Sequence, residues 1–220
     1  MEKRGLKNIA YNYLLEEITS FHLAPGQAII EQDVSNALNI SRTPVREAFK
    51  QLESEGLVYH LPSRGTFVAS MTAQDIEEIF ELREIFELAA LKNTIRYATD
   101  EEIQAVKKDL VGLRKRDGGD EDFSPEDAFY RSDRELHSLI MKYCRNSRMA
   151  KFYETLEIQL EQSRRLSAMA PQRLKKSRQE HLDIIYALEA RDFVNATRYL
   201  SVHLQNIKEN TLNVYRNKLN

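Results

Sequence analysis

The fold of the first third of this chain is decided by the stretch Ser41-Arg42-Thr43-Pro44-Val45-Arg46-Glu47-Ala48. It carries the start signals of a helix, since Thr43 suits the N-cap and Pro44 suits the first helical position. Gly56 then stands where a glycine commonly ends a helix. Apolar side chains recur at helical spacing between these signals, at Val45, Ala48, Phe49 and Leu52. This segment is therefore predicted to be an amphipathic helix.

Two helices are predicted before this one. Residues 6–21 place apolar side chains near a helical period, and Pro25-Gly26 breaks the chain after them. Residues 31–38 read as a short second helix with an apolar side, and residues 39–42 form a tight connection to the helix that follows. The pattern is that of two helices joined by a short turn, preceded by a third.

A hairpin is predicted after the third helix. Residues 57–61 and 66–68 have the composition of short strands, and Pro62-Ser63-Arg64-Gly65 joins them as a turn. Three helices followed by a hairpin predict a winged helix-turn-helix domain over residues 1–70.

The remainder, residues 71–220, reads as amphipathic helix almost throughout. Its breaks fall at short polar or Pro-containing links, which is typical of an antiparallel α-helical bundle. We therefore predict a mainly α chain of two domains, the second all-helical. The expected helices lie near residues 72–97, 100–116, 125–144, 147–167, 172–190 and 192–216.

Composition limits the classes of function. Hydrophobic residues make up 42% of the chain and the net charge is −2, so the protein has enough apolar material for a core and is not a polycation. No apolar run approaches the roughly 18 residues that span a bilayer. The single cysteine, Cys144, fits a reducing compartment. We expect a cytoplasmic protein without a membrane partner.

The start of the third helix is a candidate DNA-reading surface. Arg46 and Lys50 lie four residues apart on one side of the helix, and Arg42 lies at its N-terminus, where free backbone N–H groups favour anions. Arg64 and Gly65 at the hairpin tip are placed to reach an adjacent minor groove. Residues 1–70 nevertheless carry seven basic and eight acidic side chains, a net charge of −1. Charge and spacing alone leave a protein-interaction module open.

A family resemblance favours DNA. The segments Leu23-Ala-Pro-Gly26, Ser41 to Ala48, Leu52-Glu-Ser-Glu-Gly-Leu57 and Arg64-Gly-Thr-Phe-Val68 resemble the GntR family of bacterial regulators. The resemblance implies a homodimer on palindromic double-stranded operator DNA, with Gly65 in the wing. It implies that DNA is contacted by Arg42, Thr43 and Arg46. Where some members have an arginine on the second helix, this chain has Glu31-Gln32-Asp33, so no base contact is expected there.

Arg83 is a polar residue within an apolar stripe of the second domain. Ile76, Ile79 and Phe80 precede it and Phe86 follows, so its side chain is expected to point into the bundle. A buried guanidinium must be paired. The carboxylate of a bound ligand is one possible partner. An internal ion pair is the other, with Glu84, Glu87 and Asp133 as its candidates.

Three of the five histidines also lie on inward stripes. Asp133 and His137 are four residues apart on one helix, while His181 and His203 lie on two later helices. A single inward histidine is usually a core residue. Three with an aspartate suit a divalent metal such as Zn²⁺, Ni²⁺, Mn²⁺ or Fe²⁺ if the helices are neighbours. Spacing alone leaves both interpretations open.

The second half resembles the FCD type of C-terminal domain found in one GntR subfamily, in its shorter, VanR-like branch with six helices. The resemblance rests on Asp133-x-x-x-His137, Glu180-His181 and His203-Leu204. It implies that Asp133, His137, His181 and His203 bind one divalent metal, with zinc or nickel favoured over manganese or iron. It further implies that this metal and Arg83 bind a small carboxylate or sugar-acid effector.

The resulting expectation is a dimeric transcription regulator, acting as a repressor, whose operator binding is controlled by an organic acid. Two alternatives are weighed against it. A metalloregulator would respond to the metal ion itself. A metalloenzyme fused to a DNA-binding domain would need a catalytic base, for which Glu180 beside His181 is the candidate. No catalytic residue is predicted.

Overall fold

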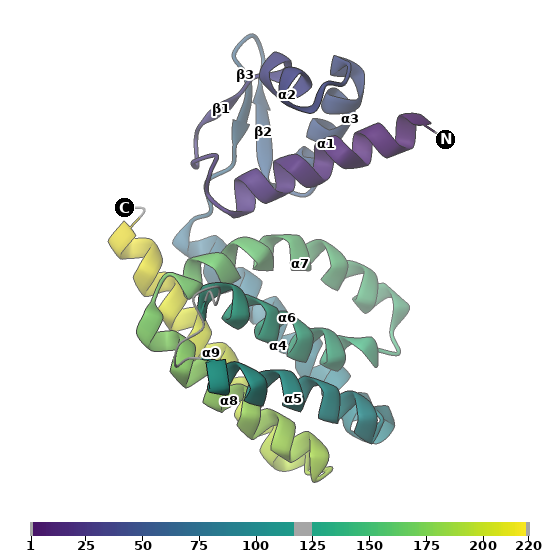
Figure 1. The fold of residues 1–220 in the computed structure, drawn as a ribbon, viewed down its shortest axis with the longest axis vertical. Helices are drawn as coiled ribbons and strands as arrows, with labels where there is room; N and C mark the ends of the chain where they lie inside the picture. Colours follow the sequence, from purple (N-terminus) through teal and green to yellow (C-terminus); the bar gives the residue numbers. More distant parts are fainter. Residues whose placement is uncertain (1, 117–124, 219–220) are drawn as a thin grey trace. The chain divides into compact units, whose positions relative to one another are not determined.

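The computed structural model describes residues 2–116 and 125–218. The chain divides into two compact units, residues 1–72 and residues 73–220. Both are shown in Figure 1. The chain is mainly helical with one small sheet, which confirms the predicted fold class.

The N-terminal unit has three helices and a three-stranded antiparallel sheet. Its helices are α1 (Glu2–Thr19), α2 (Glu31–Leu38) and α3 (Arg42–Ser54), and its strands are β1 (Ala28–Ile29), β2 (Val58–Leu61) and β3 (Gly65–Val68). The strand order is β1-β3-β2, with Ala28 opposite Phe67 and Tyr59 opposite Phe67 on the other side. The hairpin is as predicted. The two-residue β1 was not, because it is too short to show a period.

Helix α3 begins earlier than predicted. It starts at Arg42, and Ser41 is the N-cap residue with extended backbone angles (φ −71°, ψ 163°). The prediction of Thr43 as the N-cap is therefore wrong. Pro44 is tolerated because the first turn of a helix has N–H groups without intrahelical acceptors, so its missing donor removes no bond. The inward stripe is as expected, since Val45, Ala48 and Leu52 are fully buried.

The turn of the wing depends on backbone conformations that few residues adopt. Gly65 has φ +104° and Ser63 has φ +63°, and the N–H of Arg64 donates to the carbonyl of Leu61 over 3.0 Å. A glycine takes the φ of residue 65 without the steric penalty of a Cβ atom. The exposed side chain of Arg64 is thereby held at the tip of the hairpin.

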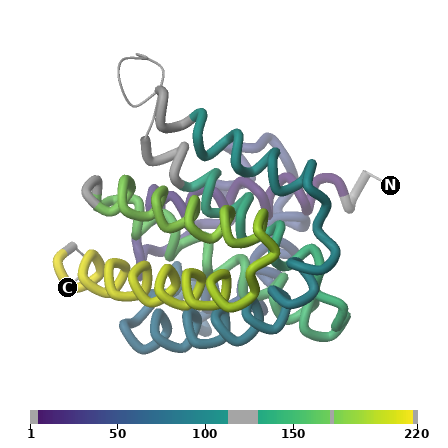
Figure 2. The backbone as a smooth tube through the Cα atoms, turned by 90° about the horizontal axis from the view of Figure 1, so that it is seen from below, coloured from purple at the N-terminus to yellow at the C-terminus, as the bar shows by residue number. Residues whose placement is uncertain are grey.

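The C-terminal unit contains six helices in the part of the chain that the structure describes, with ends close to the predicted ones (Figure 2). Asn146 caps one of them with its side chain, which accepts from the N–H groups of Arg148 and Met149. Arg191, in the left-handed region at φ +55°, turns the chain between the last two helices. The helices are α4 (Ala73–Tyr97), α5 (Asp100–Arg116), α6 (Pro125–Lys142), α7 (Ser147–Ala168), α8 (Pro171–Glu189) and α9 (Phe193–Lys218).

One apolar core joins five of these helices. It is formed by side chains such as Leu91, Ile103, Ile140, Ile185 and Leu200 from α4, α5, α6, α8 and α9. On α6, α8 and α9 the apolar side chains of this core alternate with buried polar side chains. The packing of the core therefore sets where those polar side chains lie. No helix among the described residues is long and apolar enough to cross a membrane.

Candidate metal centre and nucleic-acid interface

The four predicted metal ligands meet in the interior of the C-terminal unit. Asp133 and His137 come from α6, His181 from α8 and His203 from α9, and all four side chains are fully buried. Each offers one ligand atom, and these atoms lie within 4.8 Å of one another. The helices that carry them are therefore neighbours, which the sequence left open.

The ring nitrogens converge on one carboxylate oxygen. The distances from Asp133 Oδ1 to Nε2 of His137 and of His181 are 3.5 Å, and that to Nε2 of His203 is 3.8 Å. This oxygen accepts no hydrogen bond from any described residue. A buried carboxylate oxygen without a donor is costly. Three imidazoles and such an oxygen are a ligand set that a first-row divalent cation satisfies.

Two buried or half-buried glutamates orient the imidazoles. Glu87 Oε2 lies 2.5 Å from Nδ1 of His137, and Glu180 Oε2 lies 2.9 Å from Nδ1 of His203. A carboxylate on Nδ1 fixes the proton there and leaves Nε2 free to bind a metal. Glu180 is further held by Arg173 and Asn206. It is thus engaged as a partner of His203, which does not support its use as a catalytic base.

Ionisation of the centre also suits a metal. Burial alone raises the pKa of Asp133, but Arg83 and His137 hold it well below its ordinary value. In the same way His137 and Arg83 overcome burial and lower the pKa of Glu87 to about 2. Burial, together with His203, lowers the pKa of His181 to about 3. Asp133 is therefore charged and His181 neutral near pH 7, as metal ligands must be. Burial and Arg83 act to lower the pKa of His137, but Glu87 and Asp133 outweigh them and raise it, so a metal that binds His137 must displace a proton from it.

Arg83 points into the bundle as predicted, and its internal ion pair is present. Its Nε donates to Oε1 of Glu87 over 2.8 Å and its Nη2 donates to Oδ2 of Asp133 over 3.1 Å. Glu84, the third candidate partner, lines a groove elsewhere. An effector-binding role for Arg83 remains a prediction.

A second buried arginine was missed by the sequence reasoning. Arg164 on α7 is 2% exposed, and its Nε donates to Asp133 Oδ2 over 2.8 Å. Its Nη1 pairs with Glu157, but its buried Nη2 has no hydrogen-bond partner among the described residues. Leu156 and Leu160 precede it at i−8 and i−4, so its place on an inward stripe was a usable signal. The polar residues next to Arg164 in the sequence obscured this apolar stripe.

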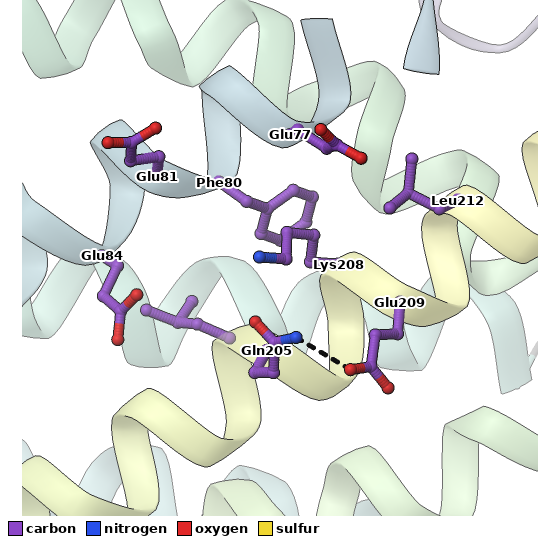
Figure 3. Close-up of a pocket in the computed structure, with 9 residues that line it drawn as sticks. Glu77, Phe80, Glu81, Glu84, Gln205, Lys208, Glu209 and Leu212 are labelled. Atoms are coloured by element: carbon purple, nitrogen blue, oxygen red, sulfur yellow. Dashed lines mark hydrogen bonds between the residues drawn. The ribbon is translucent and has the colours of Figure 1, made fainter. Parts of the chain in front are cut away.

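A groove between α4 and α9 is lined by none of the four predicted metal ligands (Figure 3). It has a volume of about 470 Å³ and an apolar floor that includes Phe80 and Leu212. Its rim carries four carboxylates, from Glu77, Glu81, Glu84 and Glu209, and one ammonium, from Lys208. The excess of negative charge makes this groove unsuited to an organic acid.

The predicted DNA-contacting side chains lie on exposed parts of the N-terminal unit. Arg42, Thr43, Arg46 and Lys50 are exposed on α3, and the wing holds Arg64 and the half-buried Gly65. Two of these arginines are engaged by α2. Arg46 Nε lies 2.8 Å from Oε2 of Glu31, and Arg42 Nε donates to Gln32 Oε1 over 2.7 Å. Helix α2, which has no arginine of its own, therefore holds two arginines of α3 through Glu31 and Gln32.

Sequence profiles of two known families match the two units. The profile of bacterial regulatory proteins of the gntR family matches residues 6–68, and that of the FCD domain matches residues 78–206. The chain belongs to the GntR family of transcriptional regulators that carry an FCD domain. Regulators of this family bind DNA, and FCD domains bind metals and small-molecule effectors.

Similar proteins agree with this assignment. The GntR/FCD chain is 27% identical over 206 residues to the HTH-type transcriptional repressor RspR of Escherichia coli (strain K12), covering 90% of this chain and 86% of RspR. Its fold matches E. coli McbR/YncC with a TM-score of 0.77 at 21% identity, covering 96% and 98% of the two chains. It matches the metal-free FCD domain of TM0439 with a TM-score of 0.59 at 24% identity, over 68% of this chain and 99% of that one. This GntR/FCD chain is a regulator and not an enzyme.

Proposed function

We propose that this regulator represses transcription by binding a palindromic operator as a homodimer, and that a small organic acid bound at a metal in its FCD domain controls that binding. The observation that carries the proposal is the convergence of three histidine Nε2 atoms on the unsatisfied Oδ1 of Asp133. A buried polar centre of this kind, in a domain attached to a helix-turn-helix, is better explained by ligand binding than by packing of the core. The proposal places the protein in the cytoplasm, with its operator.

The DNA contacts are assigned to α3 and the wing. The N-terminal end of α3 enters the major groove, where Arg42, Thr43 and Arg46 contact base edges or phosphates and Lys50 contacts the backbone. Arg64 reaches the minor groove beside Gly65, whose lack of a side chain permits a close approach. The exposure of the α3 and Arg64 side chains supports this assignment. The repressing direction is supported by RspR, which is named a repressor.

The metal is assigned to Asp133, His137, His181 and His203, with zinc or nickel as the ion that best suits three imidazoles and one carboxylate. When bound, the metal supplies a Lewis-acidic position for a carboxylate oxygen of the effector. Glu87 and Glu180 keep Nε2 of His137 and His203 directed at the centre.

The effector is assigned to the carboxylic or sugar acids. Arg83 and Arg164 are buried guanidinium groups that both lie at the Asp133 carboxylate. Together with a bound dication they would offer positive charge and hydrogen-bond donors to an anionic ligand. The unpartnered Nη2 of Arg164 is a donor for such an anion, and Arg83 lies on the same Asp133 oxygen.

Control of DNA binding follows from a shift in population. An effector that binds one arrangement of the dimer better than the other favours that arrangement, and with it one spacing of the two α3 helices. Because coupling is reciprocal, operator DNA must change effector affinity by the same factor.

The test is a thermal-shift screen of metal-loaded full chain against a panel of carboxylic and sugar acids, followed by operator titrations with any hit. A ligand at a hundred times its dissociation constant stabilises by about 2.7 kcal/mol, which raises Tm by several degrees for a chain of this size. A hit that is lost in His137→Ala and in Arg83→Met, and that changes operator affinity, supports the proposal. Operator binding that responds to the metal alone, with no hit in the panel, overturns the acid effector.

A further inference from the structure

The outer side of α4 carries a row of exposed side chains that no other helix described in the C-terminal unit covers. Positions 78, 82, 85, 89, 92 and 96 are all exposed, and the intervals between them alternate between four and three residues. Leu82 and Ile85 are 44% and 53% exposed, which is unusual for large apolar side chains at neighbouring positions. An interval averaging 3.5 residues is typical of a helix that packs along another helix. Figure 2 shows α4 at the edge of the C-terminal unit, beside α9.

The rest of α4 is already used inside the unit. Ile76, Phe80, Arg83, Glu87 and Ala90 are buried against the bundle. The outer row is therefore separate from the core side of α4, and its apolar centre is available to a partner from outside the C-terminal unit.

The charges of the row are segregated along the helix. Glu78 precedes the apolar centre, and Lys92 and Arg96 follow it, with the small Ala89 between. Neither Glu78 nor Lys92 forms an ion pair with a described residue. A helix with an acidic start, an apolar middle and a basic end is complementary to a copy of itself that runs in the opposite direction.

We infer that α4 pairs with α4 of a second copy of this chain, antiparallel, with the two-fold axis near Ile85. This rests on the homodimer of the proposed function and names its interface. The pairing places Glu78 of each copy near Lys92 and Arg96 of the other and brings Leu82 and Ile85 of both copies together. A two-fold axis makes every such contact twice. A parallel pair sets like charges against each other and is disfavoured.

The same helix then serves the dimer on one side and the metal centre on the other. Ile85 faces outward, while Arg83 and Glu87, two residues to either side, hold Asp133 and His137. A change at the centre that moves these two side chains acts directly on the interface helix. The pairing thus gives effector binding a short route to the arrangement of the dimer.

The first test is a crosslink at the axis. In full-length Cys144→Ser protein, Ile85→Cys treated with a short bismaleimide is expected to give a covalent dimer. Val194→Cys, at a 75% exposed apolar position on α9, serves as the matched control and is expected to stay uncrosslinked. Light scattering of the untreated chain gives the mass, expected to be twice the 25.7 kDa of one chain.

The outcomes separate the interface from the function. A dimer in which Ile85→Cys fails to crosslink overturns this interface and leaves the homodimer standing. A chain that stays monomeric, including on DNA, overturns the homodimer of the proposed function and this interface with it.

Charge reversal tests the direction of pairing. Glu78→Lys and Lys92→Glu are each expected to raise the dimer Kd several-fold, and the double variant is expected to recover most of the loss. A merely structural effect of either change predicts additive losses. Additive losses, or no change in either single variant, would overturn the antiparallel pairing.

Discussion

Arg46 of α3 donates from Nε to a carboxylate oxygen of Glu31 on α2 over 2.8 Å, so a side chain that we propose contacts DNA is held by an acid of the neighbouring helix. The two side chains are 62% and 32% exposed, so the pair lies largely in water. Exposed pairs of this kind contribute about 0–1 kcal/mol. If Arg46 contacts DNA as proposed, DNA should displace Glu31 at small cost, and Glu31 is expected to lower operator affinity.

Replacing Glu31 should strengthen operator binding. Glu31→Gln frees Arg46 and removes a negative charge beside the phosphates, so affinity is expected to rise by up to about fivefold at fixed salt. Fluorescence anisotropy with a labelled operator measures it. Asp33→Asn on the same helix is the control for charge alone, since the ion-pair partner of Arg46 is Glu31 and not Asp33. An equal gain in both variants would refute a specific effect of the ion pair.

Removing Arg46 should have the opposite effect. Arg46→Ala is expected to weaken operator binding by roughly 1–3 kcal/mol and to relax sequence preference, as for loss of a base contact. Lys50→Ala, which removes a proposed phosphate contact, should weaken binding to all sequences alike and reduce the salt slope by about 1. Titrations of operator and scrambled DNA at several salt concentrations distinguish the two, and unchanged affinity in Arg46→Ala would remove it from the interface.

The glutamates behind the histidines should matter for metal binding although they do not bind the ion. Glu87→Gln and Glu180→Gln each replace the charged carboxylate that directs an imidazole with a neutral amide, so metal affinity is expected to fall about 10–100-fold. Competition with a chromophoric chelator measures this. Glu84→Gln is the matched control on α4, because Glu84 lines the groove and touches no histidine. Equal affinities in all three variants would contradict the assigned centre.

Arg164 should contribute to effector binding more than to metal binding. Arg164→Met removes the unpartnered Nη2 donor, and the loss of a charged hydrogen bond is expected to cost about 1.5–3 kcal/mol in effector affinity. Calorimetry with an acid identified in the screen measures it, with metal affinity determined in parallel. Arg198→Met, at an exposed position of α9, is the control. If metal affinity falls and effector affinity per metal-loaded site does not, Arg164 only supports Asp133.

Glu102, a carboxylate outside the metal centre, should make the stability of the fold depend on pH. Hydrogen bonds from Lys142, Tyr143 and the Thr99 N–H lower the pKa of Glu102 from 4.5 to about 2. A depressed carboxyl pKa stabilises the fold above its unfolded value and loses that effect as pH falls through the folded value. The Tm of Glu102→Gln should therefore lie below that of the wild type at pH 7, and the difference should shrink between pH 4.5 and pH 2. A difference independent of pH would show that charge is not involved.

Much of the fold could be predicted because its signals are local. The apolar stripe from Val45 to Leu52 and the inward positions of Arg83 and His137 follow from helical spacing within one segment. The predicted N-cap of α3 was wrong because both Ser41 and Thr43 favour that position. The sequence does not rank two capping residues that lie so close together. Strand β1 was missed because two residues carry no period.

The sequence by itself determined which side of each helix is buried, and hence that Asp133, His137, His181 and His203 face inward. Only the tertiary structure decided that they meet at one oxygen, that Arg83 and Arg164 share the other oxygen of Asp133, and that Glu31 holds Arg46. The physical reason is that spacing along a helix sets the direction of a side chain, whereas the partner it finds depends on how distant segments pack.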